Sequence, residues 1–185
     1  MNTTVFEILK KRNSSRAFSG RPLSDEVIQS LMEAAQLSAS CYNKQPWRFL
    51  FLSESSALEK GRKALADGNS WAGKARLLIV GFSKPDLDCQ IKDGRDYYLF
   101  DLGMAVQLIL LQATEAGMIA RPMAGYSPNV IRKEFNIPDE YEVYIMIAVG
   151  YEGKVEELDE RLQKMSAAPR IRNELSVNFF RNEFE

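Results

Sequence analysis

Apolar residues recur along the chain with two different periods, one typical of helices and one typical of strands. Helical spacing predicts a first helix behind a capping box of Thr4 and Glu7, and a second helix that begins after the N-cap residue Ser24. The apolar faces of these two helices are Val5, Ile8 and Leu9, and Val27, Leu31, Ala34 or Ala35 and Leu37. We expect the second face to turn toward a core.

Strand patterns occur at Trp47–Leu52, Leu77–Phe82 and Tyr141–Val149. The last strand is apolar on both alternating faces, which is typical of a central strand covered by helices on both sides. The pattern therefore predicts an α+β fold in which helices flank a mixed central β-sheet.

Shorter helices and polar connections separate these strands. A capping box of Ser56 and Glu59 predicts a helix through Ala66, which residues 67–70 end. Ser127 followed by proline predicts a short helix through Phe135. Residues 84–95 are expected to form a polar loop that can be part of a lid, and residues 152–164 a solvated connection.

A long helix from Asp96 to Ala116 is apolar on nearly every side, and Gly117 is a good residue to end it. Asp101, Gln107 and Gln112 interrupt it too often for a membrane span, which needs about 20 mainly apolar residues. We expect protein to bury it all round. Either it is an ordinary core helix or a second copy of the chain covers part of it.

The composition of the chain excludes some classes of protein but does not indicate a function. A length of 185 residues fits one domain over residues 1–185, and a net charge of −1 gives no field that attracts nucleic acid or anionic membrane. The first helix is charged, so we expect no leader or anchor and a cytoplasmic protein. Two cysteines, Cys41 and Cys89, form no disulfide framework.

The chain contains no histidine. This removes the commonest general base, the commonest metal ligand and every nucleophile activated by histidine, so metal hydrolases are disfavoured. We assign no catalytic side chain and no metal site. Any chemistry would then come from carboxylates, lysine, tyrosine or a bound cofactor.

Residues 38–49 place small and amide-bearing side chains between a helix and a strand. Ser40, Asn43 and Gln45 can offer polar groups to a planar ligand, and Pro46 biases Gln45 toward extended backbone. A capped loop that closes onto an aromatic strand explains the same residues without a ligand.

A second candidate site follows the first helix. Arg12 and Arg16 lie four residues apart on either side of Ser14, and their guanidinium groups can converge with the hydroxyl on a phosphate. A solvated basic helix end that complements the helix dipole is the alternative.

These two segments resemble the nitroreductase family of FMN-dependent oxidoreductases, and further motifs continue the resemblance over nearly the whole chain. The motifs, in family order, are Arg12, Ser14 and Arg16; Ser40, Asn43, Gln45, Pro46 and Trp47; residues 101–107; residues 121–126; a strand that ends at residues 149–151; and Arg170 and Arg172. The resemblance implies a homodimer with flavin at the subunit interface and a swapped C-terminal arm.

The resemblance also implies an activity. It is the transfer of hydride from NADH or NADPH through bound FMN to nitroaromatics, quinones or similar electron-poor small molecules by a ping-pong mechanism. A dehalogenase or dehydrogenase of the same superfamily, or a flavin carrier or sensor without catalysis, stays open as an alternative.

Site roles follow from the same resemblance. Arg12, Asn13, Ser14, Arg170 and Arg172 would hold the phosphate or ribityl chain, with Asn13 in place of a basic residue of the family. Arg16 would lie near flavin N1 and O2 and stabilise the reduced ring, or make a second phosphate contact.

Other motif residues would contact the flavin ring. They are Ser40, Asn43 and Gln45; Asn69, which otherwise only ends a helix; and Pro122, Met123, Ala124 and Gly125, where many relatives have glutamate at the position of Ala124.

Three prominent residue types are assigned to structure instead. We expect Cys41 to pack without a second cysteine beside it, Trp47 and Trp71 to lie in the core, and Asp101 to pair with a basic residue.

Overall fold

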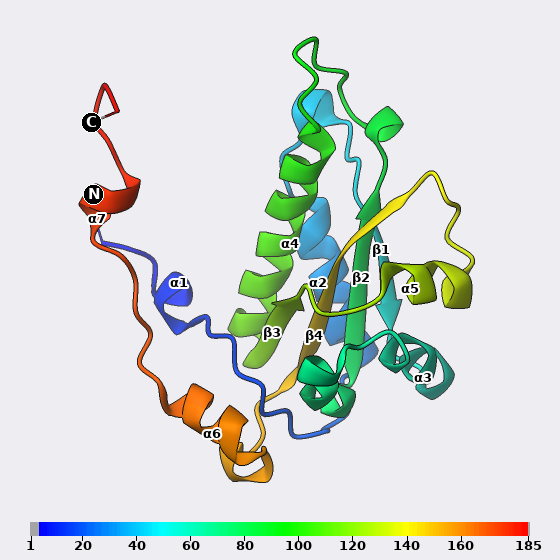
Figure 1. The fold of residues 1–185 in the computed structure, drawn as a ribbon, viewed down its shortest axis with the longest axis vertical. Helices are drawn as coiled ribbons and strands as arrows, with labels where there is room; N and C mark the ends of the chain where they lie inside the picture. The colour runs from blue at the N-terminus through cyan, green and yellow to red at the C-terminus, as the bar shows by residue number, and fades with distance from the viewer. Residues whose placement is uncertain (1–3, 185) are drawn as a thin grey trace.

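The computed structural model describes residues 4–184. Its centre is a four-stranded sheet with the order β1 (Arg48–Leu52), β2 (Leu77–Ser83), β4 (Glu142–Tyr151) and β3 (Met118–Met123) (Figure 1). All three strand pairings are antiparallel, with Leu52 opposite Leu78 in the first and Leu77 opposite Val149 in the second. The predicted α+β class is therefore confirmed.

The mixed sheet that we expected is wrong for the strands in the described residues, because none of them pairs in parallel. Burial on both faces suggested the mixed sheet, but burial depends on helices on both sides and not on strand direction. Along β2, Leu77 and Ile79 face one core while Leu78 and Val80 face the other.

Two helices cover one face of this sheet. They are α2 (Asp25–Gln36) and α4 (Tyr97–Glu115), which pack on each other and on the strands. Ser24 caps α2 as predicted, because its hydroxyl accepts the Val27 N–H. Leu31 is fully buried, but Leu37 is 83% exposed because α2 ends before it, so its predicted burial is wrong.

The other face is covered by α3 (Ser55–Arg62), the 3-10 helix η2 (Asp67–Lys74) and α5 (Pro128–Phe135). Ser127 caps α5 as predicted. The predicted box of Ser56 and Glu59 is wrong, because the N-cap of α3 is Glu54, two residues before Ser56, and no side chain caps it. The helix ends at Arg62 rather than Ala66. Trp47 and Trp71 lie in the core as expected.

Helix α4 is buried along one side only. Leu102, Ala105 and Ile109 are inaccessible or nearly so, while Phe100 is 57% exposed. Burial all round is thus wrong for one copy of the chain. By length and composition α4 is the one membrane-span candidate among the described helices, and here it packs on the sheet and on α2 as a core helix does.

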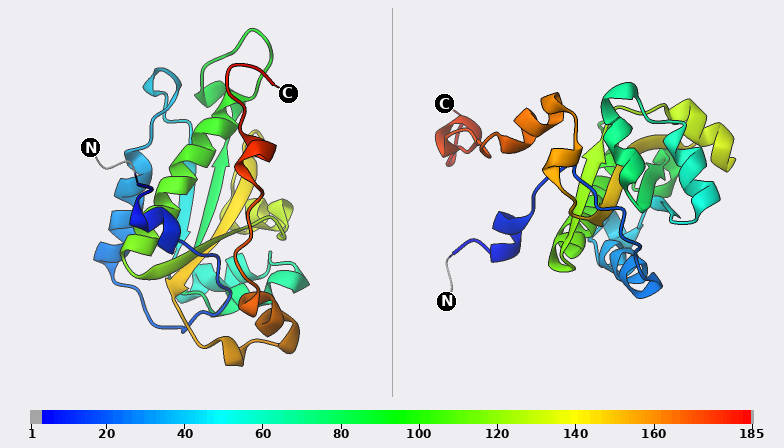
Figure 2. Two further views of the ribbon diagram at one scale, coloured as in Figure 1. Left: turned by 90° about the vertical axis from the view of Figure 1, so that its left-hand side faces the viewer. Right: turned by 90° about the horizontal axis from the view of Figure 1, so that it is seen from below.

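The ends of the chain extend away from this layered body (Figures 1 and 2). Helix α1 (Glu7–Lys11) buries none of its residues, and Phe6 is its N-cap, so the predicted box of Thr4 and Glu7 does not begin it. At the other end, α6 (Glu160–Ala167) and α7 (Leu175–Asn178) follow the 3-10 helix η4 (Val155–Glu157). The solvated connection predicted for 152–164 is therefore partly helical, because Asp159 caps α6 and Leu162 is buried.

Candidate functional site

A cavity of about 440 Å³ lies between the two ends of the chain. One wall is the segment after α1 and the other is the segment after α6. Six residues that the sequence predicted to bind a cofactor line it, namely Arg12, Asn13, Ser14, Arg16, Arg170 and Arg172. Arg12 and Arg170 are 158 positions apart, yet Arg170 Nη1 donates to the Arg12 carbonyl at 3.0 Å and to the Lys10 carbonyl at 2.9 Å.

Backbone pairing holds the N-terminal wall against the end of β4. Ser19 N donates to the Tyr151 carbonyl at 3.0 Å, and Gly153 N donates to the Ala17 carbonyl at 2.8 Å. A Cβ on Gly153 would lie 2.6 Å from the carbonyl carbon of Phe18, so only glycine allows this approach. Phe18 is buried and stacks on Trp71, which anchors the wall in the core.

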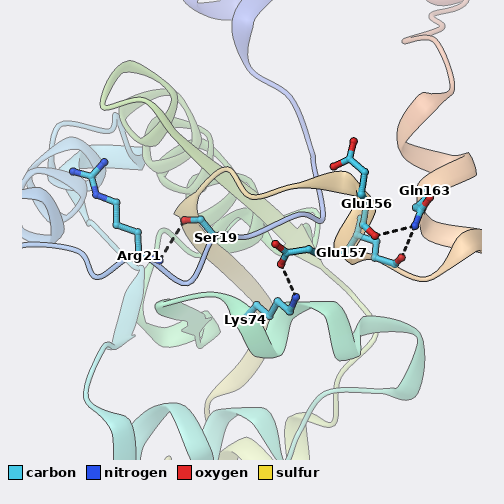
Figure 3. Close-up of polar contacts among 7 residues, drawn as sticks. Ser19, Arg21, Lys74, Glu156, Glu157 and Gln163 are labelled. Carbon is cyan, nitrogen blue, oxygen red and sulfur yellow. Dashed lines mark hydrogen bonds and ion pairs between the residues drawn. The ribbon is translucent and has the colours of Figure 1, made fainter.

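Polar contacts attach the C-terminal wall to the body of the molecule (Figure 3). Lys74 at the end of η2 pairs with Glu157 of η4 at 3.1 Å. Gln163 of α6 donates to the carbonyls of Glu156 and Leu158 at 3.2 and 2.8 Å. These contacts fix the start of α6, which leads to Arg170.

Arginine side chains around this cavity crowd one another. Burial, and then the charges of Arg170 and Arg172, lower the pKa of Arg12 from its ordinary value. Burial and the charge of Arg161 lower the pKa of Arg16 in the same direction. Within residues 4–184, none of these five arginines is in an ion pair with a carboxylate, and Glu152 is the only acid that lines the cavity. The arrangement favours an anion.

Arg121 is a further cation here that we did not assign from the sequence as a site residue. It lies on β3, its guanidinium donates to the Ser14 carbonyl, and it sits 5.3 Å from the centre of the Trp71 ring. Burial, with a contribution from Arg16, lowers its pKa to about 10. Its place beside Pro122 in the family-like motif was the only signal in the sequence.

The second predicted group, residues 122–125, begins at the end of β3 next to Arg121, which contacts the N-terminal wall of the cavity. Pro122 and Met123 end the strand. Beyond Ala124, the Gly125 carbonyl accepts Asn69 Nδ2 at 2.9 Å and the Ala66 N–H at 3.0 Å. Asn69 therefore does not end a helix, as the alternative from the sequence had it, but lies within η2 and fastens it to this segment.

The third predicted group, Ser40, Asn43 and Gln45, lies elsewhere, and none of the three lines the cavity. Their turn, which includes the 3-10 helix η1 (Cys41–Asn43), is near the start of α4 in Figure 1. Ser40 Oγ accepts the Gln45 N–H at 2.9 Å, and the Gln45 amide bonds to Gln36. The extended backbone expected for Gln45 is wrong: its φ is 49°, because the turn bends sharply before Pro46.

Two structural assignments near this turn are also wrong. Cys41 does have a second cysteine beside it, because it forms a disulfide with Cys89. Asp101 is fully buried, and no basic side chain among residues 4–184 pairs with it; its Oδ2 accepts the Cys41 N–H at 2.8 Å. Burial raises the Asp101 pKa, and the neighbouring Asp88 carboxyl raises it further. Distances along the chain of 48 and 60 residues hid these contacts from sequence reasoning.

A layered α+β fold carries an arginine-lined cavity between its two chain ends, and the charge of this cavity suits an anion. The model of the nitroreductase family matches residues 9–80 and 69–151, and the chain belongs to this family. The oxidoreductase class suggested by the motifs is thereby confirmed at the level of the family.

Individual relatives agree with that assignment. A protein of Archaeoglobus fulgidus with the provisional name NADH dehydrogenase/NAD(P)H nitroreductase is 29% identical over 150 residues, which cover 78% of this chain and 83% of that protein. An iodotyrosine deiodinase of Haliscomenobacter hydrossis is 23% identical over 79% of this chain and 78% of its own.

The fold has a solved counterpart. A crystal structure described as an oxidoreductase containing FMN superposes with a TM-score of 0.89 and 27% identity. The match covers all of this chain and 95% of that one.

Proposed function

We propose that this protein is an FMN-dependent oxidoreductase that passes hydride from NADH or NADPH to electron-poor small molecules such as nitroaromatics and quinones. The observation that carries the proposal is the set of arginines, unpaired by carboxylates within the described residues, that two distant segments bring to one cavity. Family membership and an FMN-containing structural neighbour support it.

The cavity suits the phosphate end of FMN. A phosphate monoester carries a charge of about −2 and three acceptor oxygens, and guanidinium groups offer forked donors to such a group. Arg12, Arg170 and Arg172 would bind it, and Ser14, whose hydroxyl already accepts from Arg12 at 3.0 Å, would complete the contact. Burial and then the charges of Arg170 and Arg172 lower the pKa of Arg12, and the bound anion would offset the repulsion from those charges.

When bound, FMN supplies a ring that accepts hydride at N5 and delivers it to the acceptor. The protein's part is to position that ring and to set the charge around it. Arg16 would hold positive charge beside the ring. The segment from Pro122 to Gly125, which includes Met123 and Ala124, would cover the ring. The 2.9 Å hydrogen bond from Asn69 to the Gly125 carbonyl would keep that carbonyl turned away from the ring.

A second copy of the chain would complete the site. Ser40, Asn43 and Gln45 lie away from the cavity of their own chain, so we infer that they contact the ring bound by a partner. Exposed apolar residues in α1, on α4 and along the C-terminal arm support a homodimer in which that arm crosses to the partner. One domain and a cytoplasmic location stay predictions.

The decisive experiment is an absorption spectrum of purified protein, followed by titration of any apoprotein with FMN. We expect a yellow protein that releases FMN on denaturation. NADH or NADPH should then bleach it, and an acceptor should restore the colour. Colourless protein that takes up no FMN would overturn the proposal.

Steady-state kinetics test the ping-pong cycle, in which donor and acceptor use one site in turn. Parallel lines in double-reciprocal plots are expected, whereas intersecting lines would contradict the cycle. Reductive dehalogenation is a second candidate, favoured by the deiodinase among the relatives. It would show as halide release from a halophenol. A yellow protein inert toward both nicotinamides would instead be a carrier or sensor.

A further inference from the structure

The two cysteines meet beside the turn of Ser40, Asn43 and Gln45, and the proposed chemistry uses neither of them. Cys41 lies in η1 and Cys89 follows the 3-10 helix η3 (Pro85–Leu87), and their Cα atoms are 6.2 Å apart. Both residues are partly exposed, and neither belongs to a strand or to a helix of the core. The bond therefore joins two surface segments and can open without unpacking the sheet.

Buried carboxyl groups lie directly under this bond. Asp88 is 6% exposed and Asp101 is fully buried. Cys89 N donates to Asp88 Oδ1 at 2.7 Å, as Cys41 N does to Asp101 Oδ2 at 2.8 Å. The other two oxygens, Asp88 Oδ2 and Asp101 Oδ1, are buried and have no hydrogen-bond partner in the part of the chain described here. No basic side chain in that part forms an ion pair with either carboxyl.

We propose that Cys41 and Cys89 are a reversible dithiol–disulfide couple that exchanges with small thiols, and that its state controls the turn from Ser40 to Gln45. A thiolate attacks one sulfur, the Cys41–Cys89 bond breaks and a mixed disulfide forms. A second thiolate then displaces the protein sulfur. Two thiols are oxidised to one disulfide, and the two electrons and two protons end as the Cys41 and Cys89 thiols.

One of these carboxyl groups can accept a hydrogen bond from the reduced Cys89 thiol. Asp88 Oδ1 lies 3.3 Å from Cys89 Sγ, within reach of an S–H donor. A hydrogen bond from the thiol to this oxygen would stabilise the reduced form. Such a couple suits a cytoplasmic protein, where lasting disulfides are rare.

Opening the bond has a defined local consequence. Tyr42, Asn43 and Gln45 have φ values of 46°, 54° and 49°, a left-handed conformation that residues other than glycine adopt only when the surroundings impose it. The disulfide is the only covalent tether on this turn. Reduction should let it relax. Weaker FMN binding would follow only if Ser40 and Asn43 contact the ring, so that consequence rests on the proposed function.

The couple can be measured without FMN. Purified protein is equilibrated in buffers of reduced and oxidised glutathione, alkylated with a maleimide and mapped by mass spectrometry. Hydrogen exchange is followed in residues 40–45 and 84–95. We expect both cysteines to titrate together as one two-electron couple, and amide exchange in 40–45 to speed up at least tenfold on reduction.

Variants separate the bond from the side chains. Cys89→Ser and Cys41→Ser should show the fast exchange of the reduced protein in every buffer. Gln90→Ala, which alters the same loop but keeps both cysteines, should titrate like the natural sequence. FMN titration of both redox forms then tests the link to the flavin. If neither form binds FMN, the proposed function fails. The thiol measurements still decide whether Cys41 and Cys89 form a reversible redox couple.

Several results would contradict the proposal that Cys41 and Cys89 form a reversible redox couple. They are cysteines that react independently, thiols that stay free in oxidised glutathione, and a turn whose exchange is the same in both states. Stoichiometric zinc in the reduced protein, measured by elemental analysis and released on oxidation, would instead identify Cys41, Asp88 and Cys89 as a thiolate metal site, since their ligand atoms lie within 4.8 Å of one another.

Discussion

At the scale of single residues, the arginines of the cavity form no ion pair with a carboxylate among the described residues. The Arg170 guanidinium joins the two chain ends through the Lys10 and Arg12 carbonyls, and the Arg12 guanidinium holds its own segment through the Asn13 carbonyl and Ser14 Oγ. Replacement of either arginine would therefore change structure as well as charge. The one hydrogen bond shown for Arg172 is to the carbonyl of its neighbour Ile171, at 2.7 Å. Arg172 is therefore the cleanest place to test the charge alone.

Replacement of Arg172 with methionine should weaken FMN binding by about tenfold or more, because a hydrogen bond to a charged group contributes about 1.5–3 kcal/mol. The free energy of unfolding without FMN should change by no more than about 0.5 kcal/mol. Fluorescence titration and urea unfolding measure the two effects. Arg181→Met, which removes an exposed arginine from the same arm outside the cavity, should bind FMN normally; equal losses in both variants would refute the assignment.

The buried carboxyl of Asp101 should make the stability of the protein depend on pH. Its native pKa is raised, mainly by burial, so the unfolded chain loses this proton first, near pH 4. Between about pH 4 and the native pKa of Asp101, the native state binds more protons than the unfolded state. The free energy of unfolding therefore falls as pH rises through this range.

The free energy of unfolding of the variant Asp101→Asn should not fall over this pH range. At pH values above the native pKa of Asp101, the variant should be more stable than the natural sequence by about 1 kcal/mol, because it buries no charge. Urea unfolding at a series of pH values measures it. The exposed Asp86→Asn is the control and should follow the natural profile. A parallel fall in the Asp101→Asn protein would contradict the assignment.

At the scale of elements, the segments with a strong local pattern formed where the sequence predicted them. Helix α5 has its Ser127 cap, and β2 has alternating residues in two cores. The capping boxes of α1 and α3 failed, because a motif of four residues stabilises a helix only where packing lets the helix start there. For the same reason η2 and α6 were missed: Trp71 and Leu162 are buried by tertiary contacts.

The close approach of residues 16–20 to residues 151–153 gives a prediction at this scale. Gly153→Ala should destabilise the protein by about 1–3 kcal/mol, because its methyl group would meet the backbone of Phe18 and Ser19, which cannot move like a side chain. Thermal unfolding measures this loss. Gly73→Ala is the matched control, since a Cβ there meets nothing within 4 Å. If both variants unfold alike, the packing argument is wrong.

At the scale of the whole molecule, the apolar residues left outside the body indicate a second copy. Ile171, Leu175 and Phe179 on the C-terminal arm are each at least 70% exposed, and Phe6 near α1 is 73% exposed. Apolar surface of this extent is unusual on a protein that works alone. It lies on the segments that extend from the layered core in Figure 2.

We therefore expect a dimer by light scattering coupled to size-exclusion chromatography. The double variant Phe179→Ser, Phe180→Ser should raise the dimer dissociation constant by at least tenfold, because each serine removes buried apolar area. Met32→Gln, at a partly exposed site on α2, is the control and should stay dimeric. A monomeric natural protein would remove the basis for a shared flavin site.

The sequence by itself determined the family, most of the helices and three of the four described strands, and it predicted three groups of site residues, since motifs and periodicity are local properties. Only the tertiary structure decided that Arg12 meets Arg170, that Cys41 meets Cys89 above two buried carboxyls, and that every described strand pairing is antiparallel. These contacts join positions far apart in the chain. They depend on how packed layers bring loops together, and no local pattern of residues records that arrangement.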